Sequence, residues 1–511
     1  MIQSLSIRAL AVLATVVACS SPSPDGFVVT NARLIDGTGA PARTASVRIR
    51  GDSILEVGDL KPQGNEAVVD AGGLVLAPGF IDTHSHADGD LREDTTALGA
   101  VSQGITTIIG GQDGGSHPDV GAFLSELEAR PVPVNVATYV GHGTIRMRAM
   151  GEDFRRVATA AEVDSMRRLL RAALDAGALG LSTGLEYDPG IYSSTDEVLA
   201  LAKDVAAAGG RYISHIRSED YAFWKAIDEI IRIGREARLP VQISHAKLAM
   251  RDLWGRADSL VRILEAARAD GVDITADIYP YLYWQSTLTV LFPKRDFENR
   301  ASANFALTQT TTPGGLRLAV YLPKPEYQGK TLAEIATLRG VDSVTALIDL
   351  IRDAERMRKE AQPEFIEGKT VESIIATSMV EEDVAAIMRW PFTNFCTDGS
   401  FTGSHPRGFG SFPRILGKYV RGEGVMSLEE AVRRGTSLAA RNMGIPDRGT
   451  LAPGMKADLV LLDPAAVIDR ATPDTPHETS PGIQRVWVNG REVFAGGRAT
   501  GVAAGRVIKR R

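Results

Sequence analysis

The amino-acid sequence predicts an α/β protein built around a TIM-like (β/α)8 barrel, and three observations support this fold class. The 511 residues are 44% hydrophobic and 23% charged, which is typical of globular proteins. In the middle of the chain, short apolar runs alternate with helical patterns, which predicts βα units and a parallel sheet. Eight such runs occur, and eight parallel strands favour a closed barrel. We expect strands at 74–86, 105–111, 134–140, 178–185, 211–215, 241–245, 273–279 and 393–397.

Amphipathic patterns between these strands predict the helices of the barrel. Thr159 is placed to cap the first of them, because a threonine side chain can accept a hydrogen bond from the first helical turn. The expected helices are 160–176, 195–208, 221–237 and 257–269.

The interval between the seventh and eighth strands does not fit this alternation. A structureless loop of that length is implausible in a compact domain, and the interval contains a helical pattern at 331–355. We therefore expect an inserted subdomain at about 288–390 that covers part of the barrel mouth.

Both ends of the chain have the pattern of short β-strands. Near the carboxyl end, Asn489-Gly490 is a hairpin turn signal between two apolar runs. Because neither end has enough strands for a convincing sheet alone, we expect one small β-sandwich domain built from 27–76 and 445–511. The barrel would then occupy 77–444.

The first residues have the pattern of an export signal. One positive charge, Arg8, precedes an apolar stretch at 9–18 that is too short to span a membrane as a helix. Val16-Val17-Ala18-Cys19 resembles a bacterial lipobox, in which Cys19 would be acylated. We expect a signal peptide at 1–18, a tether at 19–26 and a periplasmic protein anchored by lipid to the outer membrane. Simple signal cleavage, with Cys19 incidental, is the alternative.

Charge and cysteine content exclude other classes. The chain has 57 Lys+Arg and 63 Asp+Glu, a formal net charge of −6, with no long basic run. This argues against nucleic acid as the main partner. Two cysteines cannot form a disulfide framework.

Six potential metal ligands fall at the ends of five expected strands. Active sites of such barrels lie at the carboxyl ends of the strands, so these side chains should converge. Imidazole and carboxylate together suit a divalent metal such as Zn²⁺, bound as one or two ions. A single histidine there is more often structural, and a single Asp-Gly is usually a turn, but six such residues together predict a metal site. They are His84, His86, Asp113, His215, His245 and Asp398.

Segments throughout the chain resemble the amidohydrolase superfamily and, within it, the N-acyl-D-amino-acid deacylases, or D-aminoacylases. The His84-Ser-His86 opening marks the superfamily, whereas 181–185 (Leu-Ser-Thr-Gly-Leu) and 405–407 (His-Pro-Arg) are more specific to the deacylases. The resemblance implies zinc-dependent hydrolysis of the amide of an N-acyl-D-amino acid. It also implies a tight metal position at His215 and His245 and a second, weaker position at His84 and His86.

The same resemblance implies roles for residues near the metal. Asp398 would be both ligand and general base. The substrate carboxylate would be held by Lys247, Tyr279 and Arg407, although a solvated rim charge is the alternative for both cations. Tyr192 and Ser286 would lie nearby, and His142 would either contact the acyl carbonyl or be structural.

The chain departs from the deacylase pattern in two places. Asp113 stands where a cysteine ligand is common, and a carboxylate is a harder ligand that can bridge two ions. Bulky Tyr283 and Trp284 replace small residues and are expected to line or narrow the side-chain pocket.

The chemistry follows from the residue types as well. Zinc lowers the pKa of bound water to about 7, and Asp398 can take the proton of that water and return it to the leaving amine. Two alternatives stay open: a metal-dependent dipeptidase that cleaves before a D-residue, and a binding lipoprotein without turnover. Asp398 argues against the latter, because pure binding needs no such carboxylate.

Overall fold

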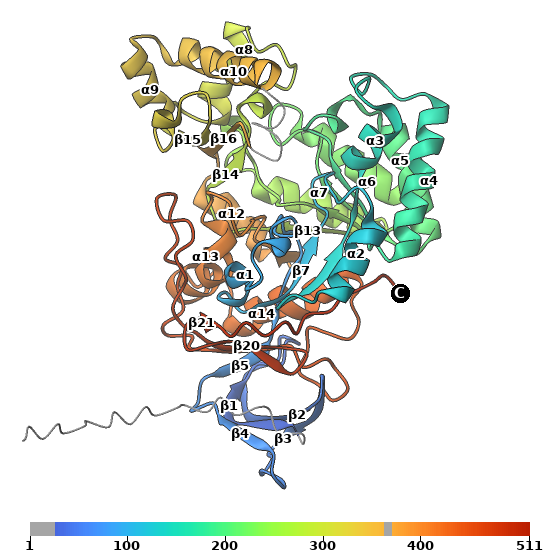
Figure 1. The fold of residues 1–511 in the computed structure, drawn as a ribbon, viewed down its shortest axis with the longest axis vertical. Helices are drawn as coiled ribbons and strands as arrows, with labels where there is room; N and C mark the ends of the chain where they lie inside the picture. Colours follow the sequence, from blue (N-terminus) through green and yellow to red (C-terminus); the bar gives the residue numbers. More distant parts are fainter. Residues whose placement is uncertain (1–25, 362–369) are drawn as a thin grey trace, which may run out of the picture.

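The computed structural model describes residues 26–361 and 370–511. In Figure 1 a β domain lies at one end of the molecule, an inserted subdomain lies at the other, and parallel strands with their helices lie between them. The expected signal peptide at 1–18, most of the tether and Cys19 lie outside the described residues. Within the described part of the chain, no helix is both long enough and apolar enough to span a membrane.

The central strands run parallel in two hydrogen-bonded sheets. One has the order β17-β13-β12-β11-β10-β9 and the other the order β6-β7-β8. Successive strands along the chain pair side by side, as expected for βα units. The strands are β6 (Phe80–Asp82), β7 (Ile105–Gly110), β8 (Asn135–Thr138), β9 (Val140–Gly141), β10 (Gly180–Gly184), β11 (Arg211–His215), β12 (Val241–Ile243), β13 (Ile274–Ile278) and β17 (Thr393–Phe395).

Backbone contacts link the two sheets at both ends. On one side only Tyr139 separates β8 from β9, so the two short strands follow one another directly. On the other side the residues after β17 bond to those after β6. The N–H of Asp398 donates to the carbonyl of His84 at 2.8 Å, and the N–H of His86 donates to the carbonyl of Gly399 at 2.9 Å. These links bring the last strand beside the first, as a closed arrangement requires.

Helices follow the strands and cover the outside of the sheets. Thr159 caps α4 in a capping box with Glu162, and Gly177 ends it at a φ of 116°. The expected helices at 160–176 and 257–269 have the predicted bounds. The helices outside the insertion are α1 (Leu98–Val101), α2 (Val120–Ala129), α3 (His142–Met150), α4 (Ala160–Ala176), α5 (Thr195–Ala207), α6 (Phe223–Ala237), α7 (Ala257–Ala269), α12 (Glu381–Arg389), α13 (Arg407–Arg414), α14 (Leu428–Arg433) and α15 (Ala439–Met443).

Both ends of the chain contribute to one sheet of nine strands. Its order is β21-β20-β19-β18-β5-β1-β2-β3, with β4 paired to β1. In place of the expected sandwich, the structure has one curled sheet. The curl brings β3 close to the start of β18, where the N–H of Ile54 donates to the carbonyl of Met455. Val47, Leu76 and Trp487 pack together in the core that the curl encloses. The strands are β1 (Phe27–Leu34), β2 (Arg43–Arg50), β3 (Ser53–Gly58), β4 (Ala67–Asp70), β5 (Val75–Pro78), β18 (Leu459–Leu462), β19 (Ile483–Val488), β20 (Arg491–Ala495) and β21 (Arg498–Ala499).

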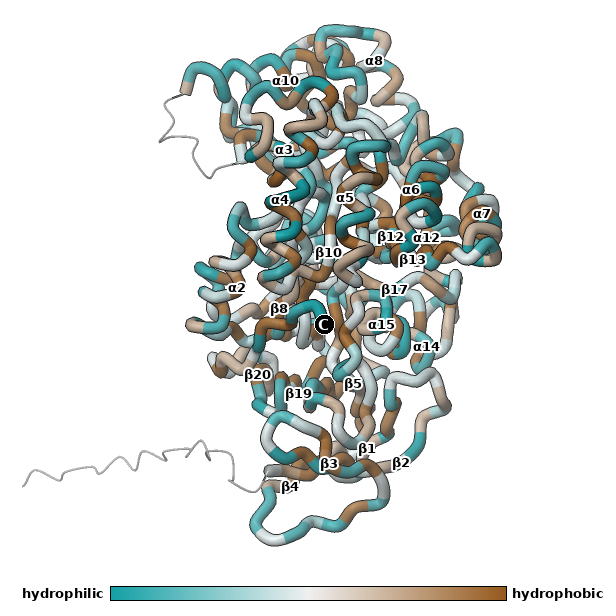
Figure 2. The backbone as a smooth tube through the Cα atoms, turned by 90° about the vertical axis from the view of Figure 1, so that its right-hand side faces the viewer, coloured by the Kyte–Doolittle hydropathy of each residue, from teal (hydrophilic) through white to brown (hydrophobic). Residues whose placement is uncertain are grey.

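The carboxyl-terminal segment returns to the parallel strands. It lies beside β8, as Figure 2 shows, and Val507 forms a parallel bridge with Val136. The chain therefore ties the β domain to the central sheets through its last residues as well as through β5.

The inserted subdomain has its own antiparallel sheet, in the order β14-β16-β15. That sheet begins at Tyr283 rather than near 288, because β14 pairs with β16. The expected helix at 331–355 is two helices, since Gly340 ends the first at a φ of 67°. In contrast, α12 packs on α7 and β17 and so belongs with the parallel strands. The elements of the insertion are β14 (Tyr283–Ser286), α8 (Arg300–Phe305), β15 (Leu316–Tyr321), α9 (Leu332–Arg339), α10 (Ser343–Glu360) and β16 (Glu372–Thr377).

Candidate metal centre

The six predicted ligands converge at the carboxyl ends of the parallel strands. The structure places them in two groups that share Asp113. His84 and His86 follow β6, Asp113 follows β7, His215 ends β11, His245 follows β12, and Asp398 follows β17.

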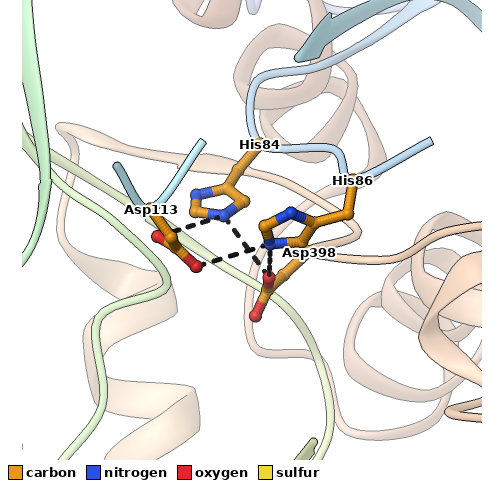
Figure 3. Close-up of side chains that lie close together, drawn as sticks. All are labelled: His84, His86, Asp113 and Asp398. Carbon is orange, nitrogen blue, oxygen red and sulfur yellow. Dashed lines mark ion pairs between the residues drawn. The ribbon is translucent and has the colours of Figure 1, made fainter. Parts of the chain in front are cut away.

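Two histidines and two carboxylates form the first group, drawn in Figure 3. Asp398 Oδ1 lies 3.3 Å from His84 Nε2 and 3.1 Å from His86 Nε2. Asp113 Oδ1 lies 3.5 Å from His84 Nε2, and Asp113 Oδ2 lies 3.4 Å from His86 Nε2. The two ring nitrogens therefore face the two carboxylates across one small space.

His215, His245 and Asp113 form the second group. His215 Nδ1 lies 3.0 Å from His245 Nε2, and Asp113 Oδ1 lies 3.3 Å from the same His245 nitrogen. Asp113 thus faces histidines of both groups. Asp113 lies within a turn that is closed by the main chain, since the N–H of Gly115 donates to the carbonyl of Gln112.

Several buried polar atoms of the first group lack hydrogen-bond partners in the described structure, as expected for a site that binds a cation. His84 Nε2, Asp113 Oδ1 and Asp398 Oδ1 are buried and have no hydrogen-bond partner in the described structure. Buried polar atoms are nearly always satisfied, so three such atoms directed at one another need a shared partner. Nitrogen and carboxylate oxygen are donors that divalent metal ions accept.

The backbone at three of these ligands lies in the left-handed region. The φ angles are 52° at Asp113, 36° at His245 and 51° at Asp398. Residues other than glycine avoid this region, at a cost of about 1–3 kcal/mol each, and such strain gathers at functional sites. The fold therefore holds these side chains in place against a local preference.

The charges at the site favour a positive partner. Burial alone would lower the pKa of His86, but its contacts with Asp113 and Asp398 raise that pKa to about 10. Burial and Lys247 would lower the pKa of His245, yet Asp113 and Asp398 raise it to about 10. A site that draws protons onto two imidazoles has an excess of negative charge, which a divalent cation can neutralise.

Two carboxylates that the sequence reasoning missed lie behind the second group. Glu186 Oε2 is 2.9 Å from His215 Nε2, and Glu219 Oε1 is 3.1 Å from His245 Nδ1. Glu186 follows β10 and Glu219 lies four residues after His215, so their positions after strands were the available signal.

A cavity of about 1680 Å³ opens above the metal ligands. His86, Asp113, His215, His245 and Asp398 lie in its wall. The insertion supplies other parts of the wall, including Trp284, Ser286, Arg295, Glu298, Arg352 and Glu355. The insertion therefore forms one part of the cavity wall, and the residues at the strand ends form the other part.

Arg407 and Tyr279 form a donor pair beside Asp398. Arg407 Nη1 donates to Asp398 Oδ2 at 2.5 Å, and the guanidinium lies 4.9 Å from the centre of the Tyr279 ring. Arg407 Nε and Tyr279 Oη are buried without a partner in the described structure. Burial raises the pKa of Tyr279 well above its usual value, so its hydroxyl keeps the proton it can donate.

Lys247 has a different environment from the expected one. Its ammonium lines the cavity but lies 2.6 Å from Glu219 Oε1, so an internal carboxylate already neutralises it. It is therefore a buried ion-pair partner, not a solvated rim charge. Tyr192 and Ser286 line the cavity, as expected.

Two expectations about the surroundings need correction. His142 is fully buried and does not line the cavity; its Nε2 lies 2.9 Å from Glu197, which corresponds to the structural alternative. Trp284 lines the cavity, but Tyr283 does not, because its ring packs on His405 with centroids 4.7 Å apart. His142 and Tyr283 thus contact residues that are distant in sequence rather than the cavity.

Comparison with known proteins agrees with this architecture. The family model described as the amidohydrolase family matches residues 67–314 and 328–494. An N-acyl-D-glutamate deacylase of Alcaligenes xylosoxydans xylosoxydans is 37% identical, with 92% of this chain and 93% of the relative covered. A D-aminoacylase of the same organism is 35% identical, with 96% and 99% covered.

A solved structure extends the likeness to three dimensions. The N-acyl-D-glutamate deacylase from Bordetella bronchiseptica, complexed with zinc and a phosphonate inhibitor, is 36% identical. It aligns with a TM-score of 0.84 over 95% of this chain and 100% of its own. These matches confirm the predicted fold class and the resemblance found in the sequence. The chain belongs to the amidohydrolase family.

Proposed function

We propose that this enzyme hydrolyses the amide bond of N-acyl-D-amino acids at a metal centre that holds one or two zinc ions. The observation that carries the proposal is a juxtaposition of unsatisfied buried atoms. Three metal-facing atoms, on His84, Asp113 and Asp398, adjoin two donors, on Tyr279 and Arg407, that have no partner among the described residues. A small molecule with an amide carbonyl near a free carboxylate satisfies both sets. The D configuration is inferred from the relatives named above.

The two groups of ligands suggest a division of the centre. His215 and His245 would hold one ion, His84 and His86 a second, and Asp113 would contribute to both. The chemistry that a bound divalent ion supplies in such a site is activation of a water molecule and polarisation of the amide carbonyl.

Asp398 is the base in this proposal. Although burial raises its pKa, the charges of Arg407, His245 and His84 outweigh burial and hold that pKa well below its usual range. The carboxylate is therefore ionised at neutral pH. It can take a proton on Oδ1, which faces His84 and His86, and return it to the amide nitrogen of the leaving amine.

Arg407 and Tyr279 orient the substrate. The guanidinium offers paired N–H groups in a plane, which suits a carboxylate, and Arg407 Nε is free to donate. The Tyr279 hydroxyl adds a neutral donor. The expected third member, Lys247, lines the cavity but is paired with Glu219, so the substrate carboxylate is left to Arg407 and Tyr279 in this proposal.

The test is a comparison of enantiomers with controlled metal content. N-acetyl-D-amino acids and their L enantiomers are assayed with enzyme stripped by a chelator and then reloaded with zinc. We expect turnover of the D series that is lost on stripping and restored by zinc. Full activity in metal-free protein, or a preference for the L series, would contradict the proposal.

A dipeptidase activity is the second candidate, and the cavity favours it. Its volume of about 1680 Å³ exceeds the roughly 300–1,000 Å³ of usual small-molecule pockets. Asp220 lines it and accepts a hydrogen bond from the hydroxyl of Ser218, so an acidic side chain lies in the wall where the ammonium of an L-Xaa-D-Xaa dipeptide could bind. Assays of such dipeptides beside the acetylated amino acids distinguish the two activities.

We also propose export and lipid attachment at Cys19, on the basis of the signal-like sequence at 1–18 and the lipobox resemblance. Periplasmic and outer-membrane fractions are probed for the wild type and for Cys19→Ala in a bacterial host. Loss of the membrane-bound fraction in the variant supports lipidation, and an unchanged distribution contradicts it.

A further inference from the structure

Both histidines of the second group meet a carboxylate through the ring nitrogen that faces away from the centre. His215 presents Nδ1 to His245 and places Nε2 at 2.9 Å from Glu186 Oε2. His245 presents Nε2 to Asp113, and its Nδ1 lies 3.1 Å from Glu219 Oε1 and 2.7 Å from Lys247 Nζ. Each imidazole therefore has one nitrogen that faces the centre and one that lies beside a buried acid, and at His245 the ammonium of Lys247 shares that outer position.

The first group lacks this arrangement. His84 Nδ1 is buried without a hydrogen-bond partner in the described structure, and Asp277 Oδ1 lies 4.0 Å from it. The side chain of His86 is 37% exposed. The two groups thus differ in how firmly their rings are oriented, although both have histidine and carboxylate ligands.

Glu186 and Glu219 are themselves held in place. The N–H of Glu219 donates to Glu186 Oε1 at 3.3 Å, so one acid is oriented by the backbone of the other. Lys247 Nζ lies 2.6 Å from Glu219 Oε1. All three side chains belong to buried residues. Lys247 therefore contacts both Glu219 and His245, and Glu186 joins the backbone of Glu219 to His215.

Glu186, His215 and Glu219 also lie close enough together to suggest a further cation site of their own. The ammonium of Lys247 argues against it, because an internal cation already occupies the position next to Glu219. Moreover, His215 Nε2 is at hydrogen-bond distance from Glu186, which leaves Nδ1 for the centre. Orientation of the rings explains these contacts better than a third ion does.

We propose that Glu186 and Glu219 are positioning residues that fix the ring orientation of His215 and His245, making their metal position the tighter of the two. Lys247 supports this arrangement by holding Glu219. A carboxylate that accepts the outer N–H of a ligating histidine typically contributes 10- to 100-fold to metal affinity. The inference rests on the metal centre of the proposed function but not on its substrate.

The test measures zinc affinity without substrate. Zinc dissociation constants are determined by chelator competition for the full chain and for Glu186→Ala, Glu186→Gln, Glu219→Ala and Glu219→Gln. We expect the alanine variants to weaken the tighter zinc site 10- to 100-fold. The glutamine variants should lose affinity in the same direction but less, because the amide oxygen still accepts the imidazole N–H. If an alanine variant does not fold, the zinc affinity of the corresponding glutamine variant tests the positioning role.

A second buried acid–histidine pair provides the matched control. Glu197 Oε1 lies 2.9 Å from His142 Nε2, the same distance as in the Glu186–His215 pair, but His142 is not among the metal-facing residues. Glu197→Gln should lower the melting temperature without changing zinc affinity. Zinc affinity that is unchanged in folded Glu186→Gln and Glu219→Gln, or equally reduced in Glu197→Gln, overturns the proposal.

The outcome is separable from the proposed activity. If the wild type binds zinc tightly, loses affinity in the Glu186 and Glu219 variants and yet hydrolyses no N-acyl-D-amino acid, the positioning role stands and the substrate assignment fails. If the wild type binds no zinc, the positioning role fails with the metal centre.

Discussion

Asp398 and Arg407 form a buried ion pair in the wall of the cavity, with Arg407 Nη1 2.5 Å from Asp398 Oδ2. The pair joins the proposed base to the proposed binder of the substrate carboxylate. Arg407 lowers the pKa of Asp398, and in return the carboxylate holds the guanidinium in place over the Tyr279 ring. A substrate carboxylate that pairs with Arg407 will offset the charge of the guanidinium and so raise the pKa of Asp398, which makes it a stronger base. Substrate binding and proton transfer are therefore coupled through this ion pair.

Replacing Asp398, the proposed base, should reduce turnover without unfolding the protein. Asp398→Asn keeps the size of the side chain and one oxygen for Arg407, so we expect a folded protein that retains much of its metal. Turnover should fall by about 10² to 10⁴, the usual contribution of a general base. Steady-state kinetics and metal analysis of the same preparation check this. Near-normal turnover would place the base elsewhere.

Asp113 should determine metal content, because its carboxylate faces histidines of both groups. In Asp113→Ala we expect metal binding and activity to fall together, with excess zinc restoring part of the activity. Asp119→Ala is the control, since Asp119 caps α2 by accepting from the N–H of Ala122. It should cost about 1 kcal/mol of stability and leave metal content intact. A full metal complement in Asp113→Ala would refute the ligand role.

Zinc should stabilise the folded chain. A ligand that binds only the native state adds RT ln(1 + [L]/Kd) to the free energy of unfolding, about 2.7 kcal/mol at 100 times Kd. We therefore expect chelation to lower the melting temperature and zinc to restore it. Calorimetry at two zinc concentrations measures the shift. A melting temperature independent of zinc would be incompatible with tight binding to the native state.

Asp220 should make stability fall as the pH rises. Burial, assisted by the charge of Glu186, raises the pKa of Asp220 to about 7, against an ordinary value of 3.8. Between these values the native state binds the proton more strongly than the unfolded state does, so deprotonation destabilises the fold. The contribution is present below about pH 4 and is lost as the pH rises toward 7.

Asp220→Asn removes this titration. Its melting temperature should exceed that of the wild type at pH 8, and the difference should shrink toward pH 4. Thermal denaturation across that range gives the measurement, and Asp228→Asn on the exposed part of α6 serves as a surface control. Parallel pH profiles for the wild type and Asp220→Asn would show that Asp220 titrates normally.

The sequence by itself determined the fold class and the type of chemistry. Both depend on local patterns: apolar alternation for the strands, caps such as Thr159 for the helices, and residue types placed directly after strands. Parallel strands bring their carboxyl ends to one edge, so residues as distant as His84 and Asp398 can be grouped from the order of the strands alone. The same reasoning predicted that the rings of His84 and His86 lie on one face, because side chains two residues apart along a strand share a face.

Only the tertiary structure decided which partner each buried charge meets. Lys247 binds Glu219, His142 binds Glu197, and Tyr283 packs on His405. Each of these partners comes from another segment, and sequence spacing does not report how loops after different strands pack. The bonding of a buried charge depends on the nearest opposite charge after packing, since an unpaired one costs several kcal/mol. For that reason the sequence placed Glu186 and Glu219 after strands, but only the assembled structure showed that they meet His215 and His245.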